Sequence, residues 1–270
     1  MKRLTLIASF LMPFSALAVE MPAANSPAYQ ECTALATSNP DQALAKADAW
    51  LKIDNGIAAQ HCRAMALYGL RRFAESADLL ASVRAAAPAS NLALRSYLTR
   101  QGAKAALAAN RVDQALGLLS SQLDEISAAQ GDNAASSRLA SELLLDRARL
   151  NGTYGKLDEA AKDLDHAVSL TPINEEVLLE RAGVFERLGD KSLARNDAEI
   201  ILRLNPNNTG ARTLLQRLGG GALPPVTQAT PVVDGAATSL ATPPVAPTKK
   251  IYHRKKPVVK APTDYQTNAP

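Results

Sequence analysis

Few side chains in this chain of 270 residues have the types and spacing that chemistry requires. Its three histidines, His61, His166 and His253, are scattered along the sequence. The run Asp163-Leu164-Asp165-His166 resembles a metal-ligand cluster in one dimension. On a helix, however, side chains two positions apart point in different directions, so these groups do not converge. We therefore expect no metal site, no catalytic site and no enzyme.

A second motif, Gly189-Asp190-Lys191-Ser192, resembles the end of a phosphate-binding loop. Such a loop follows a strand and carries a further glycine, and neither precedes this motif. We interpret it as a turn between two helices. The sequence accordingly predicts no cofactor.

The amino terminus is typical of a secretory signal peptide. Lys2 and Arg3 precede a short apolar stretch from Leu4 to Leu17, and Ala16-Leu17-Ala18 gives a small-x-small cleavage site. Residues 1–18 are therefore expected to be removed on export, which places the protein in the periplasm or in the medium. No later segment reaches the roughly 20 apolar residues that a membrane-spanning helix needs, so we expect no transmembrane segment in the mature chain.

The net charge of +4 is not spread evenly along the chain. Two basic residues lie in the signal segment and six follow residue 218, which leaves 22 of the 30 basic residues in between. Two of the 26 acidic residues lie in the tail, which leaves 24, so residues 19–218 carry a net charge of −2. The basicity belongs to the tail, and it gives no argument for a fold that binds nucleic acid.

A 34-residue repeat is the strongest pattern in the sequence. The segment from Ser141 and the segment from Glu175 share identical residues at eight aligned positions: Leu144/Leu178, Arg147/Arg181, Ala148/Ala182, Gly155/Gly189, Ala160/Ala194, Asp163/Asp197, Leu170/Leu204 and Pro172/Pro206. The alanines allow two helices to pack closely, the glycines permit a left-handed turn, and the prolines end the second helix. The arginine and aspartate of each repeat are expected to form structural ion pairs.

On these residues the chain resembles the tetratricopeptide repeat family, which has the same 34-residue period. The resemblance implies an all-α solenoid of antiparallel helix pairs with a C-terminal capping helix and a disordered tail. The expected order is a signal peptide at 1–18, a helical domain at 19–218 and a Pro/Ala/Thr-rich tail at 219–270. Within the helical domain we expect a degenerate hairpin at 24–56, repeats at 57–90, 96–129, 141–174 and 175–208, and a cap at 209–218. The stretch 125–140 is longer than the pattern requires, so we expect a loop or an extended helix there.

The two cysteines, Cys32 and Cys62, fall on the first helices of neighbouring hairpins. These helices lie side by side in the architecture that the resemblance implies. In an oxidising compartment the pair is expected to form a disulfide, and the alternative is two separately buried thiols.

The resemblance also implies a partner-binding groove on the first helix of each repeat. Transferred by position, its residues are His61, Met65, Tyr68, Tyr97, Arg100, Lys104, Leu107, Glu142, Leu145, Arg149, Glu176, Leu179, Glu186 and Arg187. Arg100, Lys104 and Arg149 form a group that could clamp a carboxylate, although the asparagines of the family's chaperone-binding clamp are missing. The alternative is a solvated charged face.

The tail contains a basic cluster at 249–260, made of Lys249, Lys250, Arg254, Lys255, Lys256 and Lys260. The first hypothesis for the whole chain is an exported scaffold that binds a partner protein or peptide through the groove. The alternative is an envelope-tethering protein whose basic tail binds an anionic surface, such as phospholipid, lipopolysaccharide or an acidic polymer. A tail that merely improves solubility is the third possibility.

Overall fold

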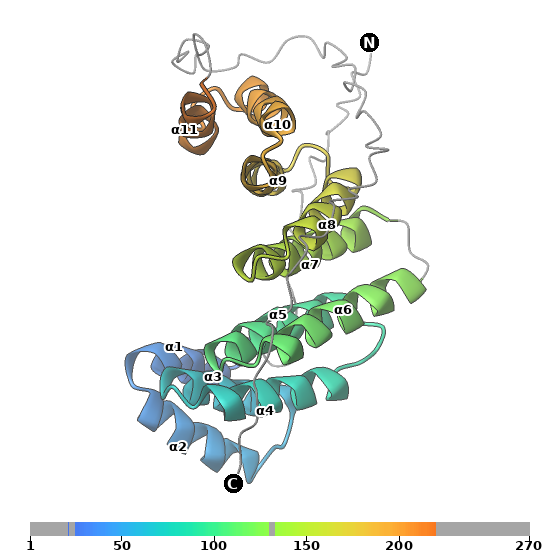
Figure 1. Cartoon of the computed structure of the whole chain (residues 1–270). Coiled ribbons are helices and arrows are strands. Elements are labelled where there is room, and N and C mark those ends of the chain that lie inside the picture. Colours follow the sequence, from blue (N-terminus) through green and yellow to red (C-terminus); the bar gives the residue numbers. More distant parts are fainter. Residues whose placement is uncertain (1–20, 22–24, 130–132, 220–270) are drawn as a thin grey trace, which may run out of the picture. The chain divides into compact units, whose positions relative to one another are not determined.

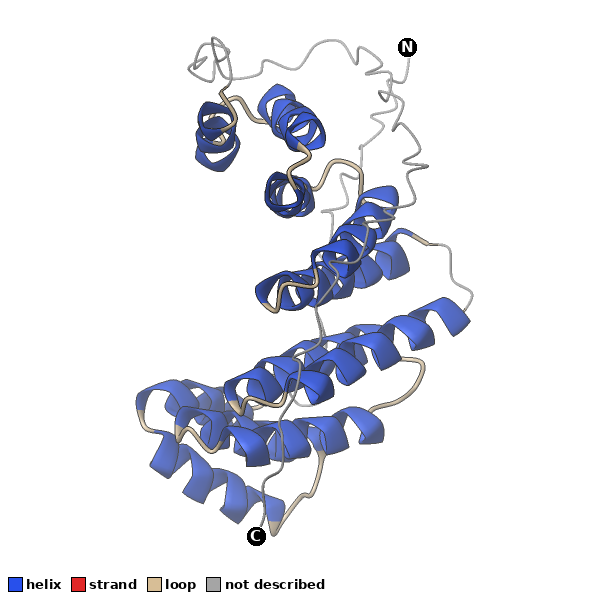
Figure 2. Cartoon of the chain, viewed as in Figure 1, coloured by secondary structure: helices blue, strands red, loops and turns tan. Residues whose placement is uncertain are grey.

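The computed structural model describes residue 21 and residues 25–129 and 133–219. The described residues form eleven α-helices and no strand (Figures 1 and 2). They are α1 (Pro27–Ser38), α2 (Pro40–Leu51), α3 (Ile57–Gly69), α4 (Phe73–Ala86), α5 (Leu92–Ala108), α6 (Val112–Ala128), α7 (Ala134–Thr153), α8 (Leu157–Leu170), α9 (Glu175–Leu188), α10 (Lys191–Leu204) and α11 (Thr209–Arg217). No helix in these ranges is both long and apolar enough to cross a membrane.

From α2 onward each helix packs mainly against the helices before and after it in the chain, as in a solenoid, and α1 packs on both α2 and α3 (Figure 1). Short turns join α1 to α2, α3 to α4, α5 to α6, α7 to α8 and α9 to α10 into hairpins, and α11 packs on α10. The predicted all-α fold of repeated helix pairs is confirmed.

Small residues occupy the helix crossings of the four regular hairpins. On the first helices these are Ala64, Ala103, Ala148 and Ala182, and on the second helices Ser76, Ala115, Ala160 and Ala194, all of them buried. Ser76 is the one polar residue of this set, and its hydroxyl donates a hydrogen bond to the carbonyl oxygen of Ala64 at 2.8 Å. A small polar residue is therefore accommodated at this crossing because its one polar group is satisfied.

The turns inside these hairpins share one backbone conformation. Arg71, Asn110, Gly155 and Gly189 occupy equivalent places, and their φ angles are 60°, 59°, 75° and 85°. The next residue in each turn donates a backbone hydrogen bond to the preceding helix, for example Arg72 to Leu67 and Asp190 to Phe185, both at 2.9 Å. The turn geometry is thus common to all four hairpins, whereas glycine is found in only two of them.

Helix ends follow local sequence signals. Pro88, Pro172 and Pro206 each lie two residues after a second helix of 14 residues, namely α4, α8 and α10. No proline follows α6, and this helix runs for 17 residues to Ala128. At the other end, the asparagine before α5, α7, α9 or α11 accepts a hydrogen bond from a backbone N–H of the first turn.

The two central hairpins are longer than the repeat pattern predicts. Helix α5 starts at Leu92 rather than near residue 96, and α7 starts at Ala134 rather than at 141. The stretch 125–140 is therefore largely helical, with α6 extended to Ala128 and residues 130–132 outside the described ranges. Asn91 and Asn133 cap these early starts.

The repeated arginine–aspartate pairs form as expected. Arg147 bonds Asp163 through two nitrogens at 2.6 and 2.9 Å, and Arg181 bonds Asp197 at 2.7 and 2.8 Å. Arg181 also reaches Asp165 of the preceding hairpin at 3.0 Å. These bonds join helices within one hairpin and between two hairpins.

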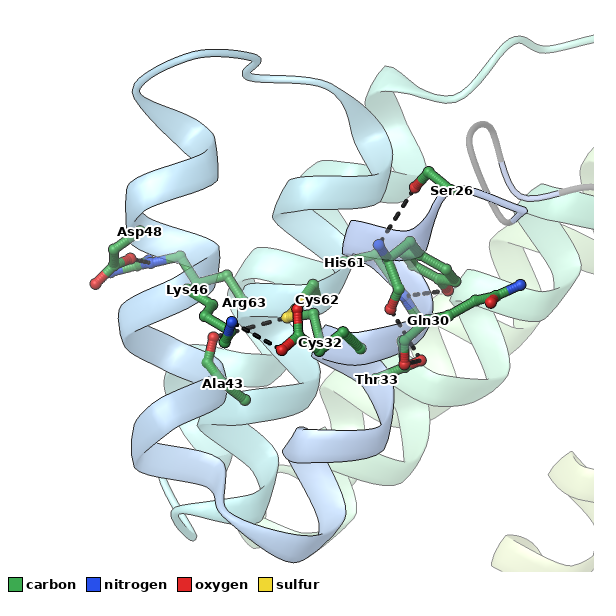
Figure 3. Close-up of a disulfide and its surroundings, with 12 residues drawn as sticks. Ser26, Gln30, Cys32, Thr33, Ala43, Lys46, Asp48, His61, Cys62 and Arg63 are labelled. Carbon is green, nitrogen blue, oxygen red and sulfur yellow. Dashed lines mark hydrogen bonds and ion pairs between the residues drawn. A yellow bond between two sulfur atoms is a disulfide. The ribbon is translucent and has the colours of Figure 1, made fainter.

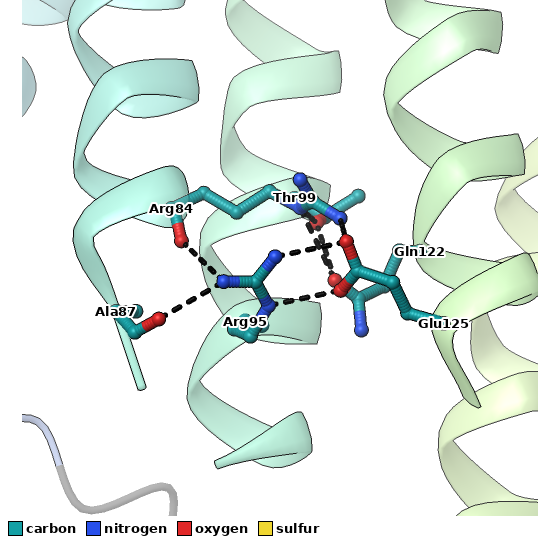
Figure 4. Close-up of polar contacts among 6 residues, drawn as sticks. All are labelled: Arg84, Ala87, Arg95, Thr99, Gln122 and Glu125. Atoms are coloured by element: carbon teal, nitrogen blue, oxygen red, sulfur yellow. Dashed lines mark hydrogen bonds and ion pairs between the residues drawn. The ribbon is translucent and has the colours of Figure 1, made fainter. Parts of the chain in front are cut away.

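A second polar cluster joins α4, α5 and α6 (Figure 4). Glu125 accepts hydrogen bonds from Arg84 at 2.6 Å and from Arg95 at 2.8 and 2.9 Å, and Arg95 also donates to the carbonyl oxygens of Arg84 and Ala87. These bonds, that from Arg95 foremost, hold the pKa of the Glu125 carboxyl below its usual range. Removing Glu125 would leave the two buried guanidiniums of Arg84 and Arg95 without their carboxylate, which is strongly destabilising.

Cys32 and Cys62 are joined by a disulfide between α1 and α3, with their Cα atoms 6.0 Å apart (Figure 3). Both residues are buried together with Ala36, Ala43, Ala47 and Ala66. Closing a loop of this length stabilises a fold by roughly 3–4 kcal/mol on the chain-entropy model. The bond fixes the degenerate first hairpin to the regular repeats.

We predict that Arg71→Gly stabilises the protein. A residue with a Cβ costs roughly 1–2 kcal/mol in the left-handed region, and glycine removes this cost. Glycine also increases the conformational entropy of the unfolded chain, which offsets part of the gain. The free energy of unfolding, measured with urea, should rise by about 1 kcal/mol at an unchanged slope.

The matched control is Asn110→Gly, which should have a smaller effect because asparagine tolerates this conformation. A loss of stability in Arg71→Gly would show that contacts of the arginine side chain hold the turn.

Candidate partner-binding groove

A groove of about 630 Å³ lies between α5 and α7 and is called the α5–α7 groove below. Helix α5 contributes Tyr97, Arg100, Gln101, Ala103, Lys104 and Leu107. The other lining residues are Leu119 of α6 and Asp146, Arg149, Leu150, Thr153 and Tyr154 of α7 and its C-terminal end. Its volume lies within the range of roughly 300–1,000 Å³ that is usual for ligand sites.

The groove combines an apolar floor with a polar rim. Ala103, Leu119 and Leu150 are buried residues that reach the floor from three helices, and Leu107 is half-buried beside them. Tyr154 lines the groove at the C-terminal end of α7 and is 50% exposed. Among the described residues it is the one large hydrophobic side chain that is both exposed and part of this groove.

Two of the three predicted cations are bonded to acidic side chains of the protein itself. Arg100 pairs with Glu142 at 2.9 Å and with Asp146. Arg149 pairs with Glu176 at 2.8 Å and with Glu180 at 3.0 Å. Arg100, Lys104 and Arg149 therefore do not form a vacant carboxylate clamp, because both guanidiniums are already bonded to carboxylates of the protein.

Lys104 has a different environment. Its Nζ lies 5.4 Å from the centroid of the Tyr68 ring, and within the described part of the chain no carboxylate pairs with it. Tyr68 in turn packs edge-on against Phe73. Lys104 is thus the groove cation that remains available to a ligand, with an aromatic face behind it.

His61 lies behind the groove wall instead of facing a partner. It is 1% exposed and sits between the rings of Tyr29 and Tyr97. Its Nε2 lies 2.7 Å from the amide oxygen of Gln101, and its Nδ1 lies 2.9 Å from the hydroxyl of Tyr29. Because an amide oxygen only accepts, Nε2 carries the proton and Nδ1 accepts from Tyr29.

This arrangement favours neutral histidine. Burial lowers the pKa of His61 below its usual range, and the hydrogen bond to Gln101 opposes the shift only in part. Burial likewise raises the pKa of the Tyr29 hydroxyl, so it remains a donor. Gln101, which the transferred pattern did not include, is held by this chain of hydrogen bonds and lines the groove.

The remaining predicted groove residues lie outside the α5–α7 groove. Met65 is half-buried against the disulfide cluster, and Leu145 is buried in the core. Toward the C-terminus, Glu186 pairs with Arg217 at 2.7 Å, and Arg187 donates to the carbonyl oxygen of Gly152 at 2.8 Å. Leu179 lines a second, smaller pocket of about 350 Å³ beside α11.

The motifs that resembled chemical sites have structural roles. Asp163 and Asp165 bond Arg147 and Arg181, and Asp190 caps α10 by accepting from the backbone N–H of Leu193. Over the described ranges no three His, Cys, Asp or Glu side chains gather as a metal site would require. The predicted signal peptide and the basic cluster at 249–260 lie outside these ranges.

Comparison with known proteins supports the fold assignment. No protein family model matches the chain, and no curated protein matches it in sequence. The solved structure of a Podospora anserina kinesin light chain with nearly identical TPR-like repeats is 17% identical, with a TM-score of 0.54, over 70% of this chain and 99% of that chain. The TPR protein YrrB is 14% identical with a TM-score of 0.49, over 71% of this chain and 91% of that chain. The likeness to the first of these two structures, together with the succession of helix pairs, shows that the described helices form a tetratricopeptide-type solenoid.

We predict that His61 makes the stability depend on pH between about 5 and 7. In this window His61 takes up a proton in the unfolded chain, where the histidine pKa is near 6.5, whereas burial disfavours its protonation in the folded chain. Stability is thus fully present above the unfolded pKa and falls as the pH drops below it, by up to about 1.4 kcal/mol per pH unit.

Urea unfolding of His61→Gln at pH 5, 6 and 7 should show a smaller slope of the unfolding free energy against pH than in the parent protein. The exposed His166, changed to Gln, is the control and should leave the slope as it is in the parent protein. An equal slope in parent and His61→Gln protein would contradict the assignment.

Proposed function

We propose that this protein is an exported scaffold that binds an extended segment of a partner protein in the α5–α7 groove. The observation that carries the proposal is the exposed Tyr154 beside an apolar floor of Ala103, Leu119 and Leu150. A rigid aromatic side chain at the lip of an apolar depression is the kind of feature on which binding energy concentrates.

The surrounding structure supports a binding role over catalysis. The two arginines of the groove, Arg100 and Arg149, are engaged in ion pairs with acidic side chains of the protein, and such pairs position side chains without activating a nucleophile. The groove is formed by packed helices whose crossings are set by buried alanines, so its walls are preorganised. Preorganisation lowers the entropic cost of binding a flexible segment.

Export is supported by two independent features. The amino-terminal sequence is typical of a signal peptide, and the Cys32–Cys62 disulfide is a bond that persists in oxidising compartments. The periplasm or the medium is therefore the proposed location. The alternative in which the basic tail tethers the protein to an anionic surface stays a prediction from the sequence.

Selection from a random dodecapeptide display library on the full mature chain tests the proposal. Peptides enriched on the parent protein should bind Tyr154→Asp at least about tenfold more weakly, because the charge enters the apolar lip and a loss of about 1.4 kcal/mol gives this factor. Fluorescence anisotropy with the labelled peptides gives the dissociation constants.

The matched control is Ile53→Asp, which changes an exposed apolar side chain of the loop after α2 that lines neither described pocket. It should leave the affinities unchanged. Enriched peptides that bind both variants equally would place binding elsewhere on the protein, and the absence of any enriched peptide would refute a peptide-binding role.

A further inference from the structure

We infer that Asn55 and Gly56 form a site of self-modification, at which the backbone nitrogen of Gly56 attacks the side-chain amide of Asn55. The product is an aspartate or an isoaspartate at position 55, and the inference is independent of what the α5–α7 groove binds. It is argued from the two Asn-Gly pairs of the chain, Asn55-Gly56 and Asn151-Gly152, which the fold places in opposite surroundings.

The reaction requires the chain itself and one water molecule. The nitrogen of Gly56 bonds to Cγ of Asn55 while the bond from Cγ to Nδ2 breaks, and the proton of the Gly56 N–H leaves with the amide nitrogen as ammonia. Water then opens the resulting succinimide ring at one of its two carbonyl carbons, which gives aspartate or isoaspartate. Glycine favours the first step because it has no Cβ to shield the attacking nitrogen.

Asn55 and Gly56 lie in the connection between α2 and α3, outside any helix, and the side chain of Asn55 is exposed. Gly56 is the N-cap residue of α3, with φ −74° and ψ 170°. An N–H group at the start of a helix has no partner in the helical ladder, so the nitrogen of Gly56 is not part of that ladder. The two reacting groups can therefore approach each other without the opening of any helix.

Gln60 of α3 is placed to assist the reaction. Its Nε2 donates to the backbone carbonyl oxygen of Asn55 at 2.9 Å and to Oδ1 of the same residue at 3.2 Å. Oδ1 is the oxygen that becomes negative when a nitrogen attacks Cγ. The hydrogen bond from Gln60 therefore stabilises the charge that develops as the ring closes.

Asn151 and Gly152 have the same sequence but lie inside α7, where Asn151 is 7% exposed. The carbonyl oxygen of Asn151 accepts a hydrogen bond from the backbone N–H of Lys156 at 2.8 Å, and that of Gly152 accepts one from Arg187 at 2.8 Å. Ring closure here requires the end of α7 to open first. Asn151 should therefore react at least about tenfold more slowly than Asn55, which corresponds to an opening free energy of about 1.4 kcal/mol.

The modification changes both the charge and the backbone at this place. Either product replaces a neutral amide with a carboxylate directly before α3, where the helix N-terminus favours negative charge. The isoaspartate also adds one methylene group to the main chain between α2 and α3. The modified fraction of the protein thus grows with the time since synthesis.

The test incubates the full mature chain at pH 8 and follows both Asn-Gly pairs by peptide mapping with mass spectrometry. In the folded protein Asn55 should be converted at least about tenfold faster than Asn151. In urea the two pairs should react at similar rates, because α7 no longer protects Asn151. An unchanged Asn55, or one common rate for both pairs in the folded protein, would overturn the inference, as would an Asn151 that stays protected in urea.

A matched pair of variants tests the role of Gln60. Gln60→Glu replaces the donor with an acceptor of the same size and should slow the conversion of Asn55 by about two- to tenfold, the range that one hydrogen bond supplies. The control Gln30→Glu changes an exposed glutamine of α1 and should keep the parent rate. Equal rates in Gln60→Glu and in the parent would overturn the role assigned to Gln60.

Discussion

The close approach of paired helices at small residues is the constraint on which the rest of this structure depends. At the crossings Ala148/Ala160 and Ala182/Ala194 there is no side chain beyond a methyl group, and all four residues are fully buried. A larger residue there would force the helices apart and cost roughly 1–3 kcal/mol. The equivalent crossing Ala103/Ala115 holds α6 close to α5, and α6 in turn packs on α7, so the same constraint shapes the groove between α5 and α7.

Much of the fold could be predicted because its determinants are local and repeat every 34 residues. Gly155 and Gly189 mark left-handed turns, and Pro172 and Pro206 follow the ends of α8 and α10. The repeat pattern starts the second regular repeat at residue 96, whereas α5 begins at Leu92, and it leaves 125–140 open between a loop and the extended helix that is found there. The capping asparagines Asn91 and Asn133 give a readable signal for the starts of α5 and α7. Arg71 shows the limit of such signals, since packing imposes the left-handed turn on a residue that does not favour it.

The candidate site was predictable only as a set of helix faces. Position in the repeat indicates that Arg100, Lys104 and Arg149 lie on the inner helices, but it does not say which acidic residues reach them. The charge of the groove depends on Asp146 and Glu180. Each belongs to a different hairpin from the arginine that it pairs with, so tertiary packing decides whether the two side chains meet. The same holds for Gln101, whose role follows from the Tyr29–His61 chain across α1, α3 and α5.

Site-specific photo-crosslinking in the native cell tests the central claim, that the α5–α7 groove holds the partner, most directly. A photoreactive phenylalanine analogue would replace Leu107 or Tyr154 in the groove, Lys162 on α8, or Lys255 in the basic tail. The account predicts that positions 107 and 154 crosslink to the same partner segment, identified by mass spectrometry, while positions 162 and 255 do not. Crosslinks confined to position 255, or a partner captured from position 162 and not from the groove, would contradict it.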